Sequence, residues 1–305
     1  MLKLRGKFFA LLLLVLLLPR ASWGAVVVTC PTSWDIGQVF AVSIMSDKPY
    51  KAPVITWLGR RVTLDVERHP PGGFISYALL GSRVRSIKPG NYPLEIRLTQ
   101  GGRTHVAREN VRLRARKYPS ENLRVAPRMV TPDKKQLPRI KKEAALAAEA
   151  KAVMTSRRLW TTPPLRPVPG AVTSPYGYQR LYNGVLKGVH SGTDFRAAVG
   201  TPVKAPFAGR VILTGDHYYA GKSIYLDSGN GVLTLFFHLD SIGVRKGDLV
   251  KKGQVIGRSG ASGRITGPHL HLGLCLAGQY VDPEPFFKKN VKGLLKGQPR
   301  KTIVR

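Results

Sequence analysis

The chain has 305 residues, of which 43% are hydrophobic, and its formal net charge is +32. This size allows one large or two medium domains with a buried core. Cys30 and Cys275 are the only cysteines in the sequence, which excludes a small fold held by a disulfide framework. We expect both thiols to be free and buried. Residues 27–29 lack the small side chains of a lipid-attachment site, so Cys30 is not expected to carry lipid.

Residues 1–24 have the pattern of a secretory signal peptide. A basic start precedes the apolar run 8–18, and Ser22 and Gly24 supply small residues at the cleavage positions. The run has eleven residues, whereas spanning a bilayer takes about 20. We therefore predict an exported protein of the periplasm or cell envelope, with no membrane span after cleavage. Retention of the segment as an N-terminal anchor stays open as the alternative.

The strong positive charge predicts an acidic partner. Removing residues 1–24 would remove four basic residues and no acid, which lowers the formal net charge from +32 to +28. Nucleic acid, an anionic membrane surface and an anionic envelope polymer all fit such a charge. Export makes nucleic acid the least favoured of the three.

Residues 25–118 show short alternating segments separated by turn signals, a spacing typical of an Ig-like β-sandwich. We expect strands in this part at 39–44, 62–66, 92–98 and 111–114. His69 and His105 fall here without partners at metal-like spacing, and we expect them on the surface or in turns.

The segment 119–165 changes composition and is predicted to link two domains. It contains a stretch rich in Ala, Lys, Glu and Arg, which indicates a helix over about 138–158, capped by Thr131 or Asp133. Its apolar stripe would lie against a domain. The members of that stripe are Ile140, Ala144, Ala147 and Met154.

Residues 166–287 return to strand patterns with glycines at nearly every junction, which indicates a second β domain. We expect its strands at 202–205, 209–213, 223–227, 232–238, 254–257 and 268–276. The basic tail 288–305 carries no acid and is expected to be disordered or to lie on an anionic surface.

Two histidine clusters in this second domain carry the chemical signal. In the segment 268–276, leucines alternate with His269 and His271, so a half-buried strand would present both imidazoles on one face. The other cluster is His-Ser-Gly-Thr-Asp at 190–194. His190 and Asp194 could share a strand face or flank a tight bend.

These residue types suit a catalytic zinc site, which needs three protein ligands and an open position. His190, Asp194 and one histidine of the 269/271 pair would bind the metal, and the other would stand free for proton transfer. His238 ends a strand on which it would share a face with Thr234 and Phe236. We expect His217 in a loop, and Cys275 too far along its strand to be a ligand.

Residues 166–287 resemble the LytM/lysostaphin-type zinc metallopeptidases, which cut peptide bonds in peptidoglycan. The resemblance covers about two-fifths of the chain. The matching runs are Ser-Pro-Tyr-Gly at 174–177, Tyr-Asn-Gly at 182–184, His-Ser-Gly-Thr-Asp at 190–194, Gly-Thr-Pro-Val at 200–203, Ala-Pro-Phe-Ala-Gly-Arg-Val at 205–211, Phe-Phe-His-Leu at 236–239, Lys-Gly-Asp-Leu-Val-Lys-Lys-Gly-Gln-Val-Ile-Gly at 246–257 and Gly-Arg-Ile-Thr-Gly-Pro-His-Leu-His at 263–271.

The resemblance implies one zinc ion per chain, held by His190, Asp194 and His271. It implies that His238 and His269 form the free pair that orients the attacking water and stabilises the oxyanion. Tyr176 or Tyr219 would line the groove or pack in the core. The implied substrate is peptidoglycan, and protein regulators are left open.

Two other functions fit the sequence less well. A catalytically silent relative that binds the wall and regulates other hydrolases would have lost metal ligands, and this chain keeps them all. A biotinyl or lipoyl carrier fits the runs at 205–209 and 246–254, but no lysine sits at a suitable hairpin tip.

Overall fold

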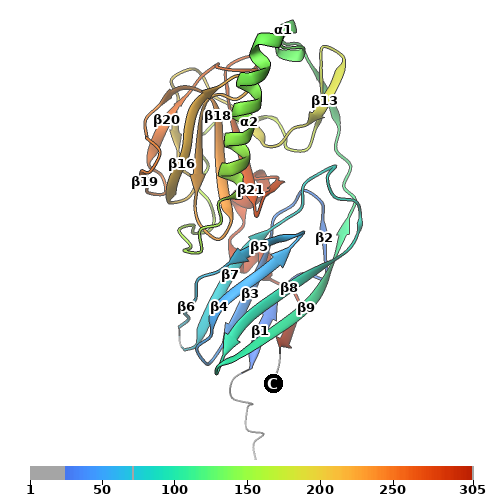
Figure 1. The fold of residues 1–305 in the computed structure, drawn as a ribbon, viewed down its shortest axis with the longest axis vertical. Coiled ribbons are helices and arrows are strands. Elements are labelled where there is room, and N and C mark those ends of the chain that lie inside the picture. Colours follow the sequence, from blue (N-terminus) through green and yellow to red (C-terminus); the bar gives the residue numbers. More distant parts are fainter. Residues whose placement is uncertain (1–24, 71, 304–305) are drawn as a thin grey trace, which may run out of the picture.

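The structure is a computed structural model that describes residues 25–70 and 72–303. The predicted signal peptide, 1–24, lies outside the described residues. As predicted, the fold is mainly β, with antiparallel sheets and one longer helix (Figure 1). Among the described residues, none of the helices is both long and apolar enough to span a membrane.

The N-terminal part is a sandwich of two five-stranded sheets. The first has the order β23-β1-β3-β7-β6 and the second β2-β9-β8-β4-β5. The strands of the first sheet that come from this part of the chain are β1 Val26–Thr29, β3 Phe40–Ser46, β6 Glu67–Arg68 and β7 Phe74–Leu80. Those of the second are β2 Ser33–Asp35, β4 Lys51–Trp57, β5 Arg60–Thr63, β8 Gly90–Gln100 and β9 Arg103–Arg114.

The sandwich core forms where the two sheets face each other. Phe40 of β3 meets Trp57 of β4 edge to face, with ring centroids 5.4 Å apart. Trp57 Nε1 donates to the carbonyl of Gly81 at 2.6 Å, which satisfies its one polar atom. Ala41 and Leu79 on the other side of the first sheet pack against the C-terminal part of the chain. This sheet is therefore covered on both faces.

The linking segment contains a strand, two short helical turns and one long helix. They are β10 Ser120–Leu123, α1 Pro127–Val130, the 3-10 helix Lys134–Gln136 and α2 Leu137–Ala152. The predicted capping is wrong: Gln136 is the N-cap and makes no side-chain cap bond, because a 3-10 turn precedes α2. The expected apolar stripe is also only partly right, since Ala144 is exposed while Ala150 is buried.

The predicted helix runs six residues too far. Instead of continuing α2, residues 153–159 make hydrogen bonds with the turn at 227–230. Thr155 Oγ1 donates to Asp227 Oδ2 at 2.5 Å, and the Asn230 amide donates to the Thr155 carbonyl at 2.6 Å. Tertiary hydrogen bonds thus replace those of a last helical turn.

The C-terminal part is built on a ten-stranded sheet with the central order β11-β14-β21-β18-β17-β16-β19. In Figure 1, α2 lies in front of it. Its strands are β11 Val172–Ser174, β14 Thr193–Arg196, β15 Pro202–Lys204, β16 Gly209–His217, β17 Gly221–Asp227, β18 Val232–Ile242, β19 Leu249–Val250, β20 Val255–Ser259, β21 His269–Leu276 and β22 Gln279–Val281.

A small three-stranded sheet stands beside it. The hairpin β12 Gln179–Tyr182 and β13 Val185–Val189 is extended by β10, which pairs in parallel with β12. Part of the segment predicted as a linker is therefore a strand of this second β part.

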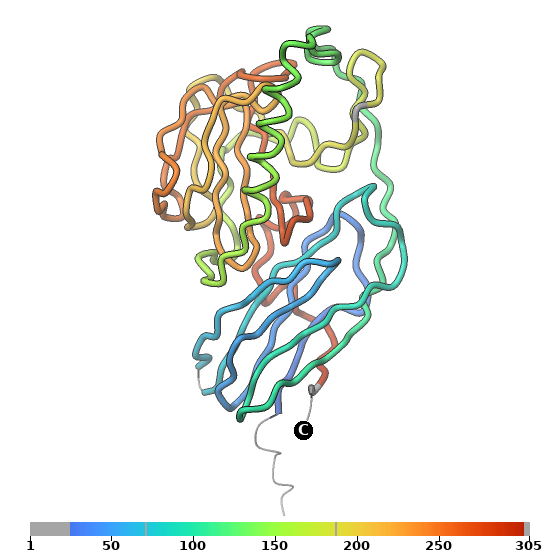
Figure 2. Tube along the Cα trace, in the orientation of Figure 1, coloured from blue at the N-terminus to red at the C-terminus, as the bar shows by residue number. Residues whose placement is uncertain are grey.

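Of the two alternatives predicted for the basic tail, disorder is wrong for its described residues, 288–303. After the 3-10 helix Glu284–Lys288, the chain forms α3 Val291–Leu295 and β23 Arg300–Ile303, and β23 pairs with β1 of the sandwich. Both ends of the described chain thus meet in the sandwich (Figure 2). Val291 and Leu294 bury their side chains, and this burial holds the tail despite its charge.

Tyr176 is a packing residue at the junction of the sandwich and the C-terminal sheet. Its ring is 1% exposed, and its hydroxyl donates to the Tyr280 carbonyl at 2.7 Å. The same hydroxyl accepts from the Val84 amide of the sandwich at 3.3 Å. Of the two roles left open for Tyr176, the core role is confirmed.

The two thiols are free and buried, as predicted. Burial raises the pKa of both Cys30 and Cys275 to about 11. We expect neither thiol to react with a disulfide reagent at pH 8 in the folded protein, and both to react once it is unfolded. Counting reactive thiols before and after denaturant tests this. Rapid reaction of either thiol in the native protein would contradict the burial.

Candidate metal centre

Neighbouring strands β14 and β21 bring the first two candidate ligands together. They pair antiparallel, with Asp194 directly opposite His271. On β21 the leucines Leu270 and Leu272 bury on the opposite face, inside the core of the sheet. This is the alternation predicted from the sequence, and it turns the imidazole side of β21 toward Asp194.

His190 reaches the same place from a bend between β13 and β14. Of the two arrangements left open, the structure has the tight bend. Gly192 allows it: a Cβ there would lie 2.3 Å from the Leu272 carbonyl oxygen and 2.6 Å from His271 Nε2. The bend therefore passes too close to β21 for any larger side chain.

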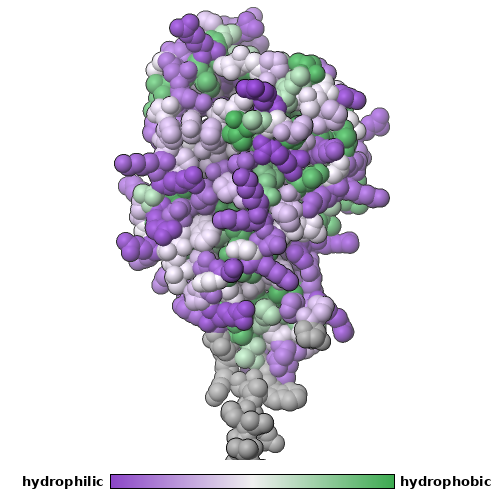
Figure 3. All heavy atoms as spheres, turned by 180° about the vertical axis from the view of Figure 1, so that it is seen from behind, coloured by the Kyte–Doolittle hydropathy of each residue, from purple (hydrophilic) through white to green (hydrophobic). Residues whose placement is uncertain are grey.

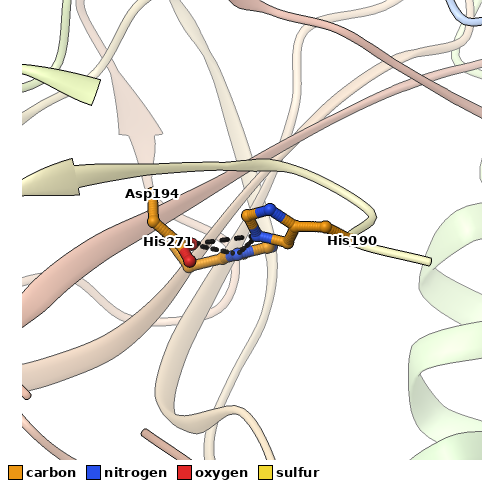
Figure 4. A group of neighbouring side chains, drawn as sticks. All are labelled: His190, Asp194 and His271. Carbon is orange, nitrogen blue, oxygen red and sulfur yellow. Dashed lines mark hydrogen bonds and ion pairs between the residues drawn. The ribbon is translucent and has the colours of Figure 1, made fainter. Parts of the chain in front are cut away.

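The three side chains converge on one point (Figure 4). His271 Nδ1 lies 2.8 Å and His190 Nε2 lies 3.0 Å from Asp194 Oδ1, and the two nitrogens are 3.0 Å apart. All three residues are buried, and their ligand atoms lie within 4.8 Å of one another. Two imidazoles and one carboxylate form a donor set that zinc accepts, so the residues fit such an ion.

A backbone carbonyl orients His190. Its Nδ1 lies 2.8 Å from the carbonyl oxygen of Pro175, which can only accept a hydrogen bond. Nδ1 therefore carries the proton in the neutral ring, and Nε2 presents its lone pair to the centre. Outer contacts of this kind raise the basicity of a histidine ligand.

Arg180 holds Asp194 from the other side, an interaction that nothing in the sequence had indicated. Its Nη2 donates to Asp194 Oδ2 at 2.5 Å, and its Nε donates to Glu121 of β10 at 2.7 Å. Ser174 Oγ also donates to Glu121, at 2.8 Å. Because Arg180 occupies Oδ2, Asp194 keeps Oδ1 for the centre.

The electrostatics favour the protonation states that a metal needs. Burial tends to raise the pKa of Asp194, but His190 and His271 outweigh it and hold this pKa well below its usual range. Burial lowers the pKa of His271 to about 4. At neutral pH the centre therefore offers a carboxylate and a neutral imidazole.

The His238 ring does not share a strand face with Phe236, as predicted, but points to the opposite side of β18. Regular alternation would place it with Phe236, on the face away from His271. Instead, β18 is bulged where it pairs with β17, and His238 has φ +63°. The bulge turns its ring to the centre, with centroids 4.9 Å from His269 and 6.0 Å from His271.

His238 and His269 share one hydrogen-bonding pattern. His238 Nδ1 lies 2.9 Å from the Ser262 carbonyl, and His269 Nδ1 lies 2.8 Å from the Gly267 carbonyl. Each neutral ring thus has its proton on Nδ1 and a bare Nε2. His269 Nε2 is buried, has no hydrogen-bond partner in the described part of the chain, and lies 3.7 Å from Asp194 Oδ1. Burial holds the pKa of His238 well below its usual range.

The remaining candidates lie elsewhere. His217 is not in a loop, which corrects the prediction: it ends β16, is buried, and its Nδ1 lies 2.8 Å from Ser223 Oγ. Cys275 lies outside the ligand cluster, as do His69 and His105. Tyr219 lines the pocket at the centre, so of its two predicted roles the groove-lining one is confirmed.

That pocket has a volume of about 160 Å³ and opens onto the centre. It is lined by Arg180, Tyr182, Val189, His190, Ser191, Tyr219, Ala220, Phe237, His238, Arg264 and His271. Three of the five residues predicted for the site, His190, His238 and His271, therefore line one concave surface.

Comparison with known proteins gives consistent matches. The model of peptidase family M23 matches residues 188–283. The chain is 46% identical over 93 residues to the peptidoglycan DD-endopeptidase ShyA of Vibrio cholerae, which is 30% of this chain and 22% of ShyA. It is 40% identical over 119 residues to lysostaphin of Staphylococcus simulans, which is 37% of this chain and 24% of lysostaphin.

One solved structure matches nearly the whole molecule. A Pseudomonas aeruginosa protein assigned to peptidase M23 is 31% identical, with a TM-score of 0.63, and the match covers 83% of this chain and 94% of that one. The similarity thus includes much more than the C-terminal sheet. The curated relatives are longer, and this chain spans only about a quarter of their length.

Proposed function

Because this chain belongs to peptidase family M23, we propose that it is a zinc-dependent endopeptidase that hydrolyses peptide bonds in bacterial peptidoglycan. The observation that carries the proposal is the buried cluster of His190, Asp194 and His271, of which both histidines line a pocket. The DD-endopeptidase activity in the name of ShyA supports a peptide bond of peptidoglycan as the target.

In this proposal His190 Nε2, Asp194 Oδ1 and His271 Nδ1 hold one zinc ion. Zinc bound there supplies a Lewis acid for the carbonyl of the scissile bond. Arg180 and the Pro175 carbonyl keep two of the ligands in place. The three side chains would fill three coordination positions of the zinc ion. The fourth position would stay open toward the pocket, where the substrate would bind.

The free histidine pair handles protons. The bare Nε2 atoms of His238 and His269 are acceptors for the proton of the attacking water. Once protonated, either ring becomes a donor that stabilises negative charge on the carbonyl oxygen and returns a proton to the leaving amine. Both rings are fixed through Nδ1, so their Nε2 atoms keep the required direction.

The proposed place of action is the periplasm or cell envelope. Support comes from the signal-like pattern of residues 1–24 and from the net charge of +32, which suits an anionic wall polymer. Hydrophilic side chains cover much of the face seen in Figure 3. Whether protein regulators bind this chain stays an open question.

Digestion of purified peptidoglycan sacculi tests the activity. We expect residues 25–305 to release soluble fragments with new free amino groups and no new reducing sugar ends, and a metal chelator to stop the release. Fragments with new sugar ends would identify a glycosidase instead. No release at any zinc concentration would favour the catalytically silent, wall-binding relative.

Replacing Arg180 with methionine should weaken zinc affinity by about 10- to 100-fold, as outer-shell changes do. The change frees Asp194 Oδ2 and leaves the Glu121 carboxylate near it without the shared cation. Competition with a coloured zinc chelator measures the affinity. Arg112→Met, an equal charge change at an exposed site on β9, should have no effect. Unchanged affinity in Arg180→Met would show that this residue does not support the centre.

Association with sacculi should weaken as salt is added, because charge attraction between exposed groups is screened over about 8 Å at physiological ionic strength. Cosedimentation from about 50 mM to 500 mM salt measures it. Binding that is independent of salt would rule out charge as the source of wall affinity.

A further inference from the structure

Arg264 is held between two aromatic rings at the wall of the pocket. Its Cζ lies 4.2 Å from the ring centroid of Tyr182 and 4.5 Å from that of Tyr219. Tyr182 ends β12, and Tyr219 follows β16, so two separate strands fix one side chain. Such stacking holds a guanidinium in one plane and leaves its N–H edge for a ligand.

The charge of Arg264 is not neutralised by the described part of the chain. No carboxylate there lies within ion-pair distance of its guanidinium, and the one hydrogen bond of this guanidinium among the described residues, from Nη1 to the Met129 carbonyl, is long at 3.5 Å. The other arginine of the pocket, Arg180, pairs with both Glu121 and Asp194. Among the described residues, no acidic side chain lines this pocket. Arg264 is therefore its one uncompensated arginine.

Arg264 also lies between two neighbouring pockets. It lines the pocket with His238 and His271, and it lines a second pocket of about 140 Å³ with Asp194 and His269. A peptide that fills either pocket beside the proposed metal centre therefore lies against residues next to this guanidinium. A half-buried cation favours an anionic partner more strongly than one in open water does.

We propose that Arg264 is a specificity-determining residue that binds a carboxylate of the peptide substrate beside the scissile bond. The inference rests on the proposed endopeptidase function. A guanidinium edge and a carboxylate match in two parallel hydrogen bonds, which select both charge and orientation. The tyrosine rings hold Arg264 in place before the substrate arrives, which lowers the entropic cost of binding.

The test uses two soluble cross-linked peptides from peptidoglycan, one with its carboxylates free and one with them converted to carboxamides. The amide keeps the shape and removes the charge. We expect the wild-type protein to prefer the free acid by about 10- to 100-fold in kcat/KM, mostly through KM, as a charge-assisted pair predicts. Amidating one carboxylate at a time identifies the group that is bound.

The Arg264→Met variant should cleave both peptides with the kcat/KM that the wild-type protein has for the amidated peptide. The Arg264→Lys variant should keep part of the preference for the free acid. Arg112→Met serves as the matched control and should retain the full preference. Equal cleavage of both peptides by the wild-type protein, or an undiminished preference in Arg264→Met, would overturn the inference alone. Failure of the wild-type protein to cleave either peptide or sacculi would overturn the proposed function itself.

Discussion

Replacing His271 with alanine is expected to abolish zinc binding and the hydrolysis of peptidoglycan together. The change removes one of the three proposed ligands from a cluster whose ligand atoms lie 2.8–3.0 Å apart. The loss of zinc affinity should exceed the 10- to 100-fold that outer-shell changes cause. Zinc content of the purified variant, with digestion of sacculi by the same sample, measures both effects.

His271 is also part of the fold, so this prediction needs a folding control. Its ring stacks on Phe237 with centroids 5.1 Å apart, and alanine leaves that space empty. The unfolding curve of the variant should still show a single cooperative transition. His105→Ala, on β9 far from the cluster, should keep both zinc and activity. A folded His271→Ala protein that retains one zinc per chain would contradict the ligand assignment.

Replacing His238 with asparagine is expected to lower kcat by about 10²- to 10⁴-fold while zinc stays bound, since general acid–base catalysis contributes that much. Asparagine is the sharper choice over alanine because it tolerates the left-handed backbone at φ +63°. The change thus removes the imidazole without adding strain. Steady-state kinetics and zinc content on one sample separate the two roles.

The comparison with His271→Ala makes this prediction discriminating. Replacing a metal ligand should cause the loss of zinc, whereas replacing a proton-transfer residue should leave zinc bound. His269→Ala should resemble His238→Asn, because both rings have a bare Nε2 beside the cluster. Loss of zinc in His238→Asn, or kcat close to that of the wild-type protein, would show that His238 is not a proton-transfer group.

Local periodicity was enough to predict β21. A strand whose leucines alternate with His269 and His271 must turn both imidazoles to one side, whatever the rest of the fold does. The sequence also indicated that small residues at 191–193 allow a bend after His190. It could not choose between a bend and a shared strand face, because that choice depends on how closely β21 approaches Gly192.

His238 shows where periodicity fails. One extra residue in β18 opposite β17 reverses the side to which the ring points, and no residue type in the segment 232–238 announces it. Bulges arise from the pairing of two strands, so they are visible only when both are in place.

Arg180 and Glu121 show a second limit. They are 59 residues apart, and Glu121 lies in a stretch that reads as a linker. Its strand β10 forms only by pairing with β12. The prediction of disorder for the tail 288–305 is wrong for the same reason. Its basic composition does not indicate a strand, but β23 forms there by pairing with β1. Non-local pairing overrides composition in both places.

Titration of zinc into the metal-free protein, with the release of fragments from sacculi measured at each step, tests whether one bound zinc ion drives the hydrolysis of peptidoglycan. We expect no release without metal, then activity that rises with added zinc and saturates at one ion per chain. Activity in the absence of metal, or no activity at one bound zinc per chain, would contradict this expectation.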